Sequence, residues 1–367
     1  MKRIQSSSSS TPSNEMTAPL NRRAAMTRVG AFLGAGALAS VTEREAFSQT
    51  TREVVFANWG GPAIQTFSSA FGPLLSDKGI KLSFDGSGPT AGKIRNMVEA
   101  RHVVWDICDS GLGSTMELGA LGLLEPIDYA VVDKTKVLPG YAVKYGVAGY
   151  TFSSVIAYDS SRFPTAPNSW ADFWDVARFP GKRLLNRNIH GVLEAALMAD
   201  GVDRTKLYPI DMERAFRKIR QLKPDLLYWS SAADSQRMLR DGEVTMAMIW
   251  STRVVSLAAE SKGRIGWTFN QGILQPGMYV IPKGSPNAKA AMQALALMQE
   301  PAAQLEIYRA MGYGPSNPAA ASQLSGAEQR NNPTFSANLA VQVPQDPTWY
   351  GENQSKALQA YLEVISS

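Results

Sequence analysis

The chain has 367 residues, of which 44% are hydrophobic and 19% are charged, and its formal net charge at pH 7 is +5. A chain of this length exceeds one small core and predicts roughly two domains. Residues 1–48 hold six Lys or Arg against three Glu, so +3 of the charge lies there. Because nucleic-acid binding needs a basic stripe with interleaved aromatic residues, the remaining charge predicts no nucleic-acid partner.

Residues 1–48 are predicted to be an export signal. A basic stretch with the pair Arg22-Arg23 precedes an apolar run of small residues at 29–41, and "AFS" offers a cleavage site before Gln49. The run is too short for a stop-transfer helix. The arginine pair favours the twin-arginine route, and the Sec route is the alternative.

The rest of the chain is expected to be a soluble, monomeric protein of the periplasm. No later stretch of the sequence is long and apolar enough to span a membrane. Cys108 is the single cysteine, which suits an oxidising compartment because it has no internal partner for a disulfide. Either Met1 or Met16 is the start of translation.

Short apolar strands alternate with helices from about residue 51. Three strand and helix pairs come first: 53–59 with 61–75, 80–85 with 88–101, and 103–111 with 114–122. The long, aromatic and glycine-containing stretch 146–158 predicts a strand or crossover between domains. This alternation is typical of parallel β-α units, so we predict an α/β fold with sheets flanked by helices.

A second α/β region follows. Helices are expected at 168–175, 192–200 and 212–222, and strands at 182–186, 226–230 and 243–250. Three further helices are expected near 287–299, 301–311 and 355–365. The stretches 275–277 and 312–318 are rich in Gly and Pro and are predicted to be loops.

Sequence motifs for catalysis are absent. There is no phosphate-binding glycine loop, nucleophile elbow or Cys-x-x-Cys pair. His102 ends a helix and is expected to cap it or face solvent, whereas His190 lies on a strand-to-helix loop and is a candidate ligand contact. No cluster of metal ligands is visible either, so we predict no metal and no cofactor.

Five predicted strands end in polar loops, and four of these loops also carry glycine or tryptophan. These loops are 58–61, 85–88, 109–111, 186–188 and 250–253. Ligands of open α/β sheets bind at the carboxyl ends of strands, where glycines permit close approach and helix N-termini attract anions. Each loop alone is equally well explained as a tight turn or cap, but together they predict one shared cleft.

Six motifs occur in a fixed order: "NWG", "WDICDSG", "SWADFWDVARFPGKRLL", "DGEVTMAMIW", "YVIPKGSPN" and "GYGPSNPAA". Over about 53–320 the chain resembles the substrate-binding proteins of ABC importers, of the polyamine-binding type. The resemblance implies a type II periplasmic-binding-protein fold, with a ligand cleft between two lobes that close about a hinge and dock on a permease. Lobe one would hold 51–150 plus 273–320, and lobe two 151–272 plus 321–367.

The predicted ligand-binding residues are Trp59, Gly60, Ser110, Gly111, Arg187, Asn188, His190, Trp250, Gln275 and Tyr313. Trp250 and Tyr313 match aromatic positions of the resembling family. Trp59 ends the first strand, where its ring is expected to lie against a ligand; the alternative is that it fills the core.

The acids that a polyamine needs are missing from the resembling positions. Residues 186–191 read Asn-Arg-Asn-Ile-His-Gly, and 275–277 read Gln-Pro-Gly in place of Trp-x-Asp. Arg187 suits a carboxylate instead, so we predict a small polar solute, amino-acid-like or opine-like, with a polyamine as the alternative. Alternatively, Arg187 faces solvent or pairs with Asp85 or Asp234.

Two other classes of function compete with solute binding. A cysteine-dependent enzyme would use Cys108, but the adjacent Asp109 points to the opposite face of the strand, so a buried small hydrophobe is the favoured interpretation. A ferric-ion carrier would need paired tyrosines. Tyr279, Tyr313 and Tyr350 are the candidates, and nothing in the sequence pairs them.

Overall fold

The computed structural model describes residues 52–367. The predicted export signal and its cleavage site lie outside the described residues. The described residues 52–367 belong to one compact unit. In the part of the chain that the structure describes, no helix is long and apolar enough to cross a membrane.

The strands are β1 Arg52–Ala57, β2 Ile80–Asp85, β3 Ile107–Gly111, β4 Ala142–Val143, β5 Gly146–Asp159, β6 Arg183–Asn186, β7 Leu226–Trp229, β8 Met246–Trp250, β9 Ile265–Val280, β10 Gly314–Pro315 and β11 Val343–Pro344. The helices are α1 Pro62–Ser76, α2 Ala91–Glu99, α3 Leu112–Ala120, α4 Trp170–Trp174, α5 Val192–Ala199, α6 Met212–Leu222, α7 Ala232–Arg240, α8 Ser251–Glu260, α9 Ala288–Leu297, α10 Pro301–Met311, α11 Pro318–Ala321, α12 Gly326–Asn331, α13 Ser336–Leu339 and α14 Pro347–Ser366.

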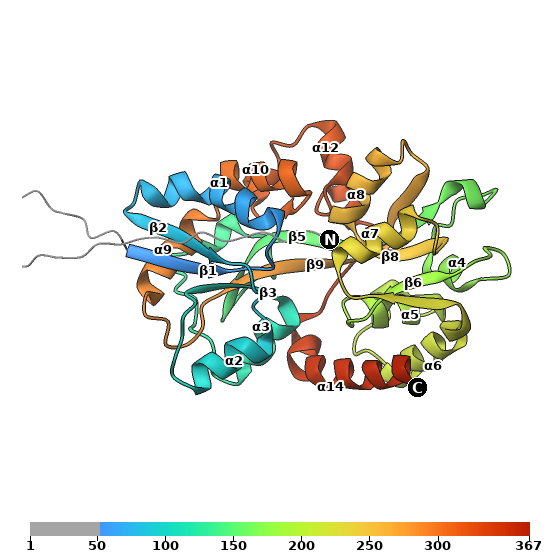
Figure 1. Cartoon of the computed structure of the whole chain (residues 1–367), viewed down its shortest axis with the longest axis horizontal. Coiled ribbons are helices and arrows are strands. Elements are labelled where there is room, and N and C mark those ends of the chain that lie inside the picture. The colour runs from blue at the N-terminus through green and yellow to red at the C-terminus, as the bar shows by residue number, and fades with distance from the viewer. Residues whose placement is uncertain (1–51) are drawn as a thin grey trace, which may run out of the picture. The chain divides into compact units, whose positions relative to one another are not determined.

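The strands form one sheet in the order β2-β1-β3-β9-β5-β8-β6-β7. The outer strands pair in parallel, as the β-α alternation predicts, whereas β5 and β9 pair antiparallel along almost their whole length. Helices cover both faces: α1 and α10 lie on one side of β1–β3, and α2 and α3 on the other (Figure 1). The α/β fold predicted from the sequence is confirmed.

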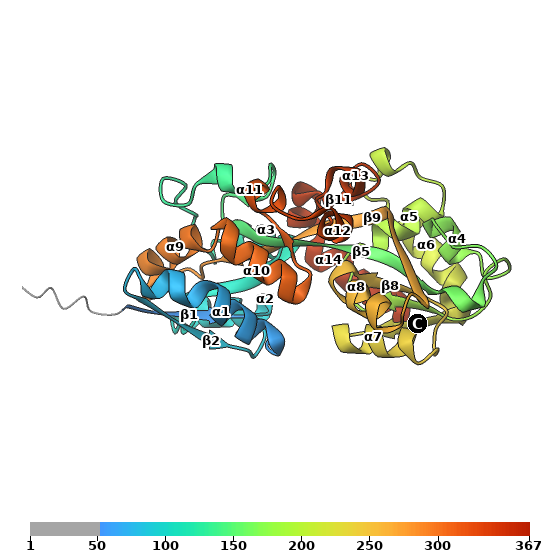
Figure 2. The ribbon, with the colours of Figure 1, turned by 90° about the horizontal axis from the view of Figure 1, so that it is seen from above.

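Three hydrophobic cores share this sheet. The first is built on β1, β3, α1 and α9; the second on β6, α4–α6 and α14; and the third on β8, α7 and α8. Strands β5 and β9 contribute to all three cores and are the strands that cross from the first core to the other two (Figure 2). Each core buries the apolar face of its helices, which is the main source of stability in such layered folds.

Helix starts follow local capping chemistry. Ser169 Oγ accepts a hydrogen bond from Asp172 N at 3.1 Å and starts α4, which lies within the predicted helix at 168–175. Asp346 Oδ1 accepts one from Trp349 N at 2.8 Å and Pro347 takes the first helical position, so α14 begins eight residues before the predicted 355.

The predicted loop at 275–277 is wrong, because Gln275, Pro276 and Gly277 lie inside β9. Gly277 is the last residue of β9 paired with β3, while Ile273 and Leu274 pair with β11. Pro276 therefore lies between two partners on that side of β9, where its missing N–H leaves no ladder bond unmade. The predicted loop 312–318 likewise contains β10, which pairs with β5.

Candidate ligand-binding site

The loop after β1 is locked to the loop after β2. Asn58 Oδ1 accepts a hydrogen bond from Gly60 N at 2.8 Å, and Asn58 O accepts one from Gly88 N at 3.0 Å. Gly60 has a φ of 75°, and a Cβ there would lie 2.8 Å from the carbonyl oxygen of Gly86. Only glycine therefore fits at position 60 without moving the neighbouring loop.

Trp59 lies on the surface at the end of this strand. Its side chain is 57% exposed, whereas Asn58 before it is fully buried. One edge of the indole ring covers Gly88, where a Cβ would lie 3.2 Å from the ring. The alternative that Trp59 fills the core is wrong, because β1 ends at Ala57 and the chain turns outward. Contact between this open ring and a ligand stays a prediction.

A buried carboxyl group lies near the end of β3. Asp109 is 3% exposed, and the hydroxyl of Tyr150 donates to its two oxygens at 3.0 and 3.1 Å. Burial raises the pKa of Asp109 to about 7, and the hydrogen bond from Tyr150 opposes the rise. Tyr313, a predicted site residue, stacks on Tyr150 with ring centroids 4.2 Å apart. The predicted residues Ser110 and Gly111 follow Asp109 directly, and Ser110 is buried.

Gly277 makes room for this aromatic stack. It is the register partner of Tyr150, and a Cβ on Gly277 would lie 2.1 Å from the Tyr150 ring. Tyr279, two residues further along β9, is the register partner of Asp109 on β3. Its buried hydroxyl has no hydrogen-bond partner among residues 52–367. Glycine at 277 therefore admits an aromatic ring where the resembling family carries an acid.

His190 faces Gly111 from the other side of the site. A Cβ on Gly111 would lie 3.7 Å from His190 Cε1. Gln275 Nε2 donates to Ser154 Oγ at 2.8 Å, and Ser154 Oγ donates to His190 O at 3.2 Å. Burial lowers the pKa of His190 to about 4, with the Gln275 side chain opposing the shift. The imidazole is therefore neutral at pH 7.

The first turn of α8 presents donors with no partner. Its N-cap residue, Trp250, packs edge-on against Phe152 and Trp229, at centroid distances of 5.5 and 5.1 Å. In the described part of the chain, Trp250 Nε1 and Arg253 Nε are buried atoms without a hydrogen-bond partner. Arg253 is half-buried and takes part in none of the ion pairs among those residues.

Tyr313 lies between charges from both sides of the site. Burial raises its pKa to about 12, the charge of Arg253 lowers it, and the charge of Asp109 raises it. The backbone before Tyr313 also touches α8, because a Cβ on Gly312 would lie 3.5 Å from the Cα of Thr252. The site thus holds one guanidinium from α8 and one carboxyl group from β3. Both residues lie in loops that the sequence marks, but neither is among the predicted ligand-binding residues.

Arg187 is exposed, in contrast to Arg253. It makes no ion pair with Asp85, Asp234 or any other acid among residues 52–367, so the alternative that it pairs with an acid is wrong, and its exposure agrees with the alternative that it faces solvent. The neighbouring Asn188 is half-buried, and its Oδ1 atom has no hydrogen-bond partner in the described chain. Asn188 therefore offers an acceptor, while Arg187 is exposed and makes no ion pair among the described residues.

Cys108 is fully buried on the strand beside Asp109. Burial raises the pKa of its thiol well above the ordinary value, and the charge of Asp109 adds to the rise, so the thiol stays protonated. The interpretation of Cys108 as a buried small hydrophobe is confirmed. His102, likewise, is exposed at a helix end.

The three tyrosines considered for ferric ion do not gather in one place. Tyr279 and Tyr313 both pack on Tyr150, whereas Tyr350 belongs to the second core and donates to Glu194. Among residues 52–367 no group of three or more His, Cys, Asp or Glu is placed to hold a metal ion.

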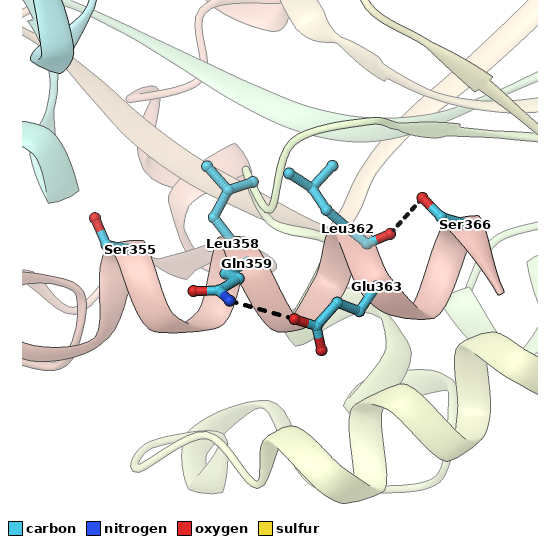
Figure 3. Close-up of a pocket in the computed structure, with 6 residues that line it drawn as sticks. All are labelled: Ser355, Leu358, Gln359, Leu362, Glu363 and Ser366. Atoms are coloured by element: carbon cyan, nitrogen blue, oxygen red, sulfur yellow. Dashed lines mark hydrogen bonds between the residues drawn. The ribbon is translucent and has the colours of Figure 1, made fainter.

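Two grooves open elsewhere on the surface. One, of about 430 Å³, runs along α14 and is lined by Ser355, Leu358, Gln359, Leu362, Glu363 and Ser366. Gln359 donates to Glu363 at 3.3 Å along this face (Figure 3). The other, of about 570 Å³, is lined by residues near 139–141, 204–208 and 342–347. Neither groove contains a predicted site residue.

A sheet shared by separate cores, with polar loops at the strand ends, is the architecture of two-lobe periplasmic binding proteins. Residues 64–337 match the model of the bacterial extracellular solute-binding protein family. The chain belongs to this family, and the family resemblance predicted from the sequence is confirmed.

Individual relatives agree with this assignment. The chain is 34% identical over 254 residues to a gamma-aminobutyric acid-binding protein of Pseudomonas aeruginosa, which covers 67% of this chain and 72% of that protein. It matches the solved structure of the Atu4243-GABA receptor with 33% identity and a TM-score of 0.80, over 86% of this chain and 98% of that chain. The binding protein MotA of A. tumefaciens B6 in complex with glucopine matches with 30% identity and a TM-score of 0.79, over 85% and 99%.

Proposed function

We propose that this protein is the solute-binding component of an ABC importer and that it captures, in the periplasm, a small solute bearing a carboxylate and an amine. The observation that carries the proposal is the guanidinium of Arg253, which has no anionic partner in the described part of the chain. Its half-buried side chain lies in the first turn of α8 and joins no ion pair among residues 52–367. Names of two relatives, which refer to gamma-aminobutyric acid, support a solute with both groups.

A carboxylate fits the first turn of α8 for physical reasons. A desolvated guanidinium without an anionic partner is destabilising, and a carboxylate satisfies it with two parallel hydrogen bonds. The free N–H groups at the start of α8 and Trp250 Nε1 add donors to the same anion. This turn replaces the loop of Arg187 as the first candidate for the anionic end of the solute.

The amine is expected to meet acceptors from the remaining site residues. Asn188 Oδ1 and Gln275 Oε1 are buried acceptors without a hydrogen-bond partner in the described chain. His190 is uncharged at pH 7, so it does not repel an ammonium group. An extended polyamine fits less well, because each ammonium head calls for a carboxylate and Asp109 already accepts from Tyr150.

The lobe boundaries and the transport cycle belong to the same proposal. Lobe one comprises 51–150 plus 273–320 and lobe two 151–272 plus 321–367, which agrees with the division of the buried residues between the first core and the other two. The lobes close on the solute about β5 and β9, and the closed form docks on a membrane permease. The protein acts as a monomer without catalysis, in line with the buried, protonated thiol of Cys108.

Calorimetry with the purified protein tests this function. Gamma-aminobutyric acid, acidic amino acids, opines and putrescine are the probes, with Arg253→Ala compared against Arg187→Ala. We expect an amino acid or opine to bind and Arg253→Ala to remove about 2–5 kcal/mol of binding, which is roughly 30- to several-thousand-fold in Kd. Arg187→Ala is the matched control, because it deletes an exposed guanidinium near the same site.

Three outcomes separate the possibilities. A larger loss in Arg187→Ala than in Arg253→Ala would move the carboxylate to the loop after β6. Micromolar binding of putrescine with no response to acidic solutes would show that the chain binds polyamines. Turnover of a probe that disappears in Cys108→Ser would make the protein an enzyme.

A further inference from the structure

Helix α14 contacts helices from two different cores. Its residues Trp349, Tyr350, Ala357, Tyr361 and Val364 are buried in the second core, whereas α3 belongs to the first. The two helices nevertheless lie side by side (Figure 1). The contact is additional to the crossing strands β5 and β9, so it is a separate connection between the cores.

The contact between α14 and α3 is made at glycines. A Cβ on Gly351 of α14 would lie 2.9 Å from the Cβ of Met116, and a Cβ on Gly113 of α3 would lie 2.2 Å from Oε1 of Gln354. One turn further along, Ser355 Oγ donates to Glu117 Oε1 at 2.5 Å. The helix backbones therefore approach more closely than side chains at these positions would allow.

The residue before Gly351 connects α14 to α5. The hydroxyl of Tyr350 donates to Glu194 Oε1 at 2.8 Å and lies 3.5 Å from Ile189 O. Glu194 is fully buried in the first turn of α5 and also accepts from Tyr208 at 2.6 Å. Because a buried carboxyl group needs these donors, the start of α5 is held firmly against α14.

Helices α3 and α5, which α14 contacts, both begin at the candidate site. Helix α3 starts directly after Gly111, and α5 starts two residues after His190. We propose that α14 is a brace that sets the separation between Gly111 and His190, with Gly351 as the positioning residue on the α3 side and Tyr350 on the α5 side. This role goes beyond the proposed function, because the brace acts with no solute bound.

If α14 sets this separation, replacing different glycines by alanine should move the two helices by different amounts. A methyl group at position 351 meets the Cβ of Met116, which is fixed to the α3 backbone and cannot rotate away, so the two helices must separate. A methyl group at position 113 meets only the far end of Gln354, which can turn aside. Gly92 in α2 has nothing within 4 Å of a Cβ and is the matched control for an added methyl group in a helix.

His190, one of the two histidines of the chain, can report this separation in an NMR titration. In a titration of the solute-free protein, the half-buried His190 imidazole of the wild type should change protonation near pH 4, because desolvation in the site lowers its pKa. We expect Gly351→Ala to admit water and raise the pKa of His190 toward the ordinary 6.5, and Gly113→Ala to raise it less. Gly92→Ala should leave it unchanged, and the exposed His102 is the internal reference.

A second variant keeps the test decisive if Gly351→Ala does not fold, which circular dichroism would show. Ser355→Asp at an exposed position sets a carboxylate against Glu117 and should also raise the pKa of His190; adding Glu117→Lys should reverse the effect. An unchanged His190 titration in the folded variants at 351 and 355 would overturn the brace, as would an equal shift in Gly92→Ala. No solute is needed, so failure here is independent of the proposed function.

Discussion

Replacing Asp109 by Asn should stabilise this protein at high pH, where the gain exceeds the cost of burying an amide, and should lose this advantage at low pH. Asp109 is 3% exposed and its pKa is raised from 3.8 to about 7, mainly by burial. The folded protein therefore holds a proton that the unfolded chain releases between about pH 4 and pH 7. A group of this kind lowers the free energy of unfolding as pH rises through that window, because the folded state binds more protons than the unfolded state.

The size of the effect follows from the shift. About three pKa units correspond to roughly 4 kcal/mol of destabilisation above pH 7, of which roughly 3 kcal/mol appears between pH 5 and pH 8. Asn has nearly the same shape, keeps an acceptor for the Tyr150 hydroxyl and cannot ionise. Its unsatisfied N–H₂ group costs about 1–3 kcal/mol, but that cost is the same at both pH values and cancels in the comparison.

Urea unfolding of wild type and Asp109→Asn at pH 5 and pH 8 measures this difference. Asp203→Asn is the control: Asp203 accepts hydrogen bonds from Thr205 and has a lowered pKa, so it is ionised in both states across this window. Its replacement should change stability equally at the two pH values. If Asp109→Asn gains no more at pH 8 than at pH 5, Asp109 is not a buried acid and the charge assignment of the site is wrong.

Two other predictions concern export and closure. Replacing Arg22-Arg23 by Lys-Lys should block export if the twin-arginine route is used; periplasmic protein at the wild-type level after cell fractionation would indicate the Sec route instead. Small-angle X-ray scattering should show a smaller radius of gyration at saturating solute if the two lobes close about β5 and β9 as proposed. No change between free and saturated protein would contradict a closing clamp.

The fold was predictable because its strands and helices have clear periodicity. The β-α alternation before residue 150 predicts the parallel strands and covering helices of the first core, and α6 has the predicted bounds of 212–222. The loop predicted at 275–277 is wrong because Pro276 and Gly277, taken alone, are typical of a turn. Pairing of β9 with its neighbours outweighs that local preference, and no single-sequence pattern shows which strands will be neighbours.

The residues that assemble the charge of the site were harder to predict. Arg187 attracts attention because it replaces acids of the resembling family, yet the structure leaves it in solvent. Arg253 follows Trp250 by three residues in a loop that the sequence does mark, but burial of its Nε depends on α8 packing beside residues 312–313. That contact joins segments about sixty residues apart, so the sequence alone carries no signal for it.

The charges of the site set a condition on its solute. At pH 7 His190 is neutral, Asp109 is near its own midpoint and the Arg253 side chain makes no ion pair among residues 52–367, so these three groups together carry up to one positive charge. A monoanion neutralises it, whereas a dication adds charge to a region where desolvation already penalises charge. A zwitterion supplies the carboxylate for Arg253. If the ammonium group of the zwitterion lies near Tyr313, its charge stabilises the ionised form of Asp109. If the solute pairs with Arg253 as proposed, this arrangement of charges favours an amino acid over an extended polyamine.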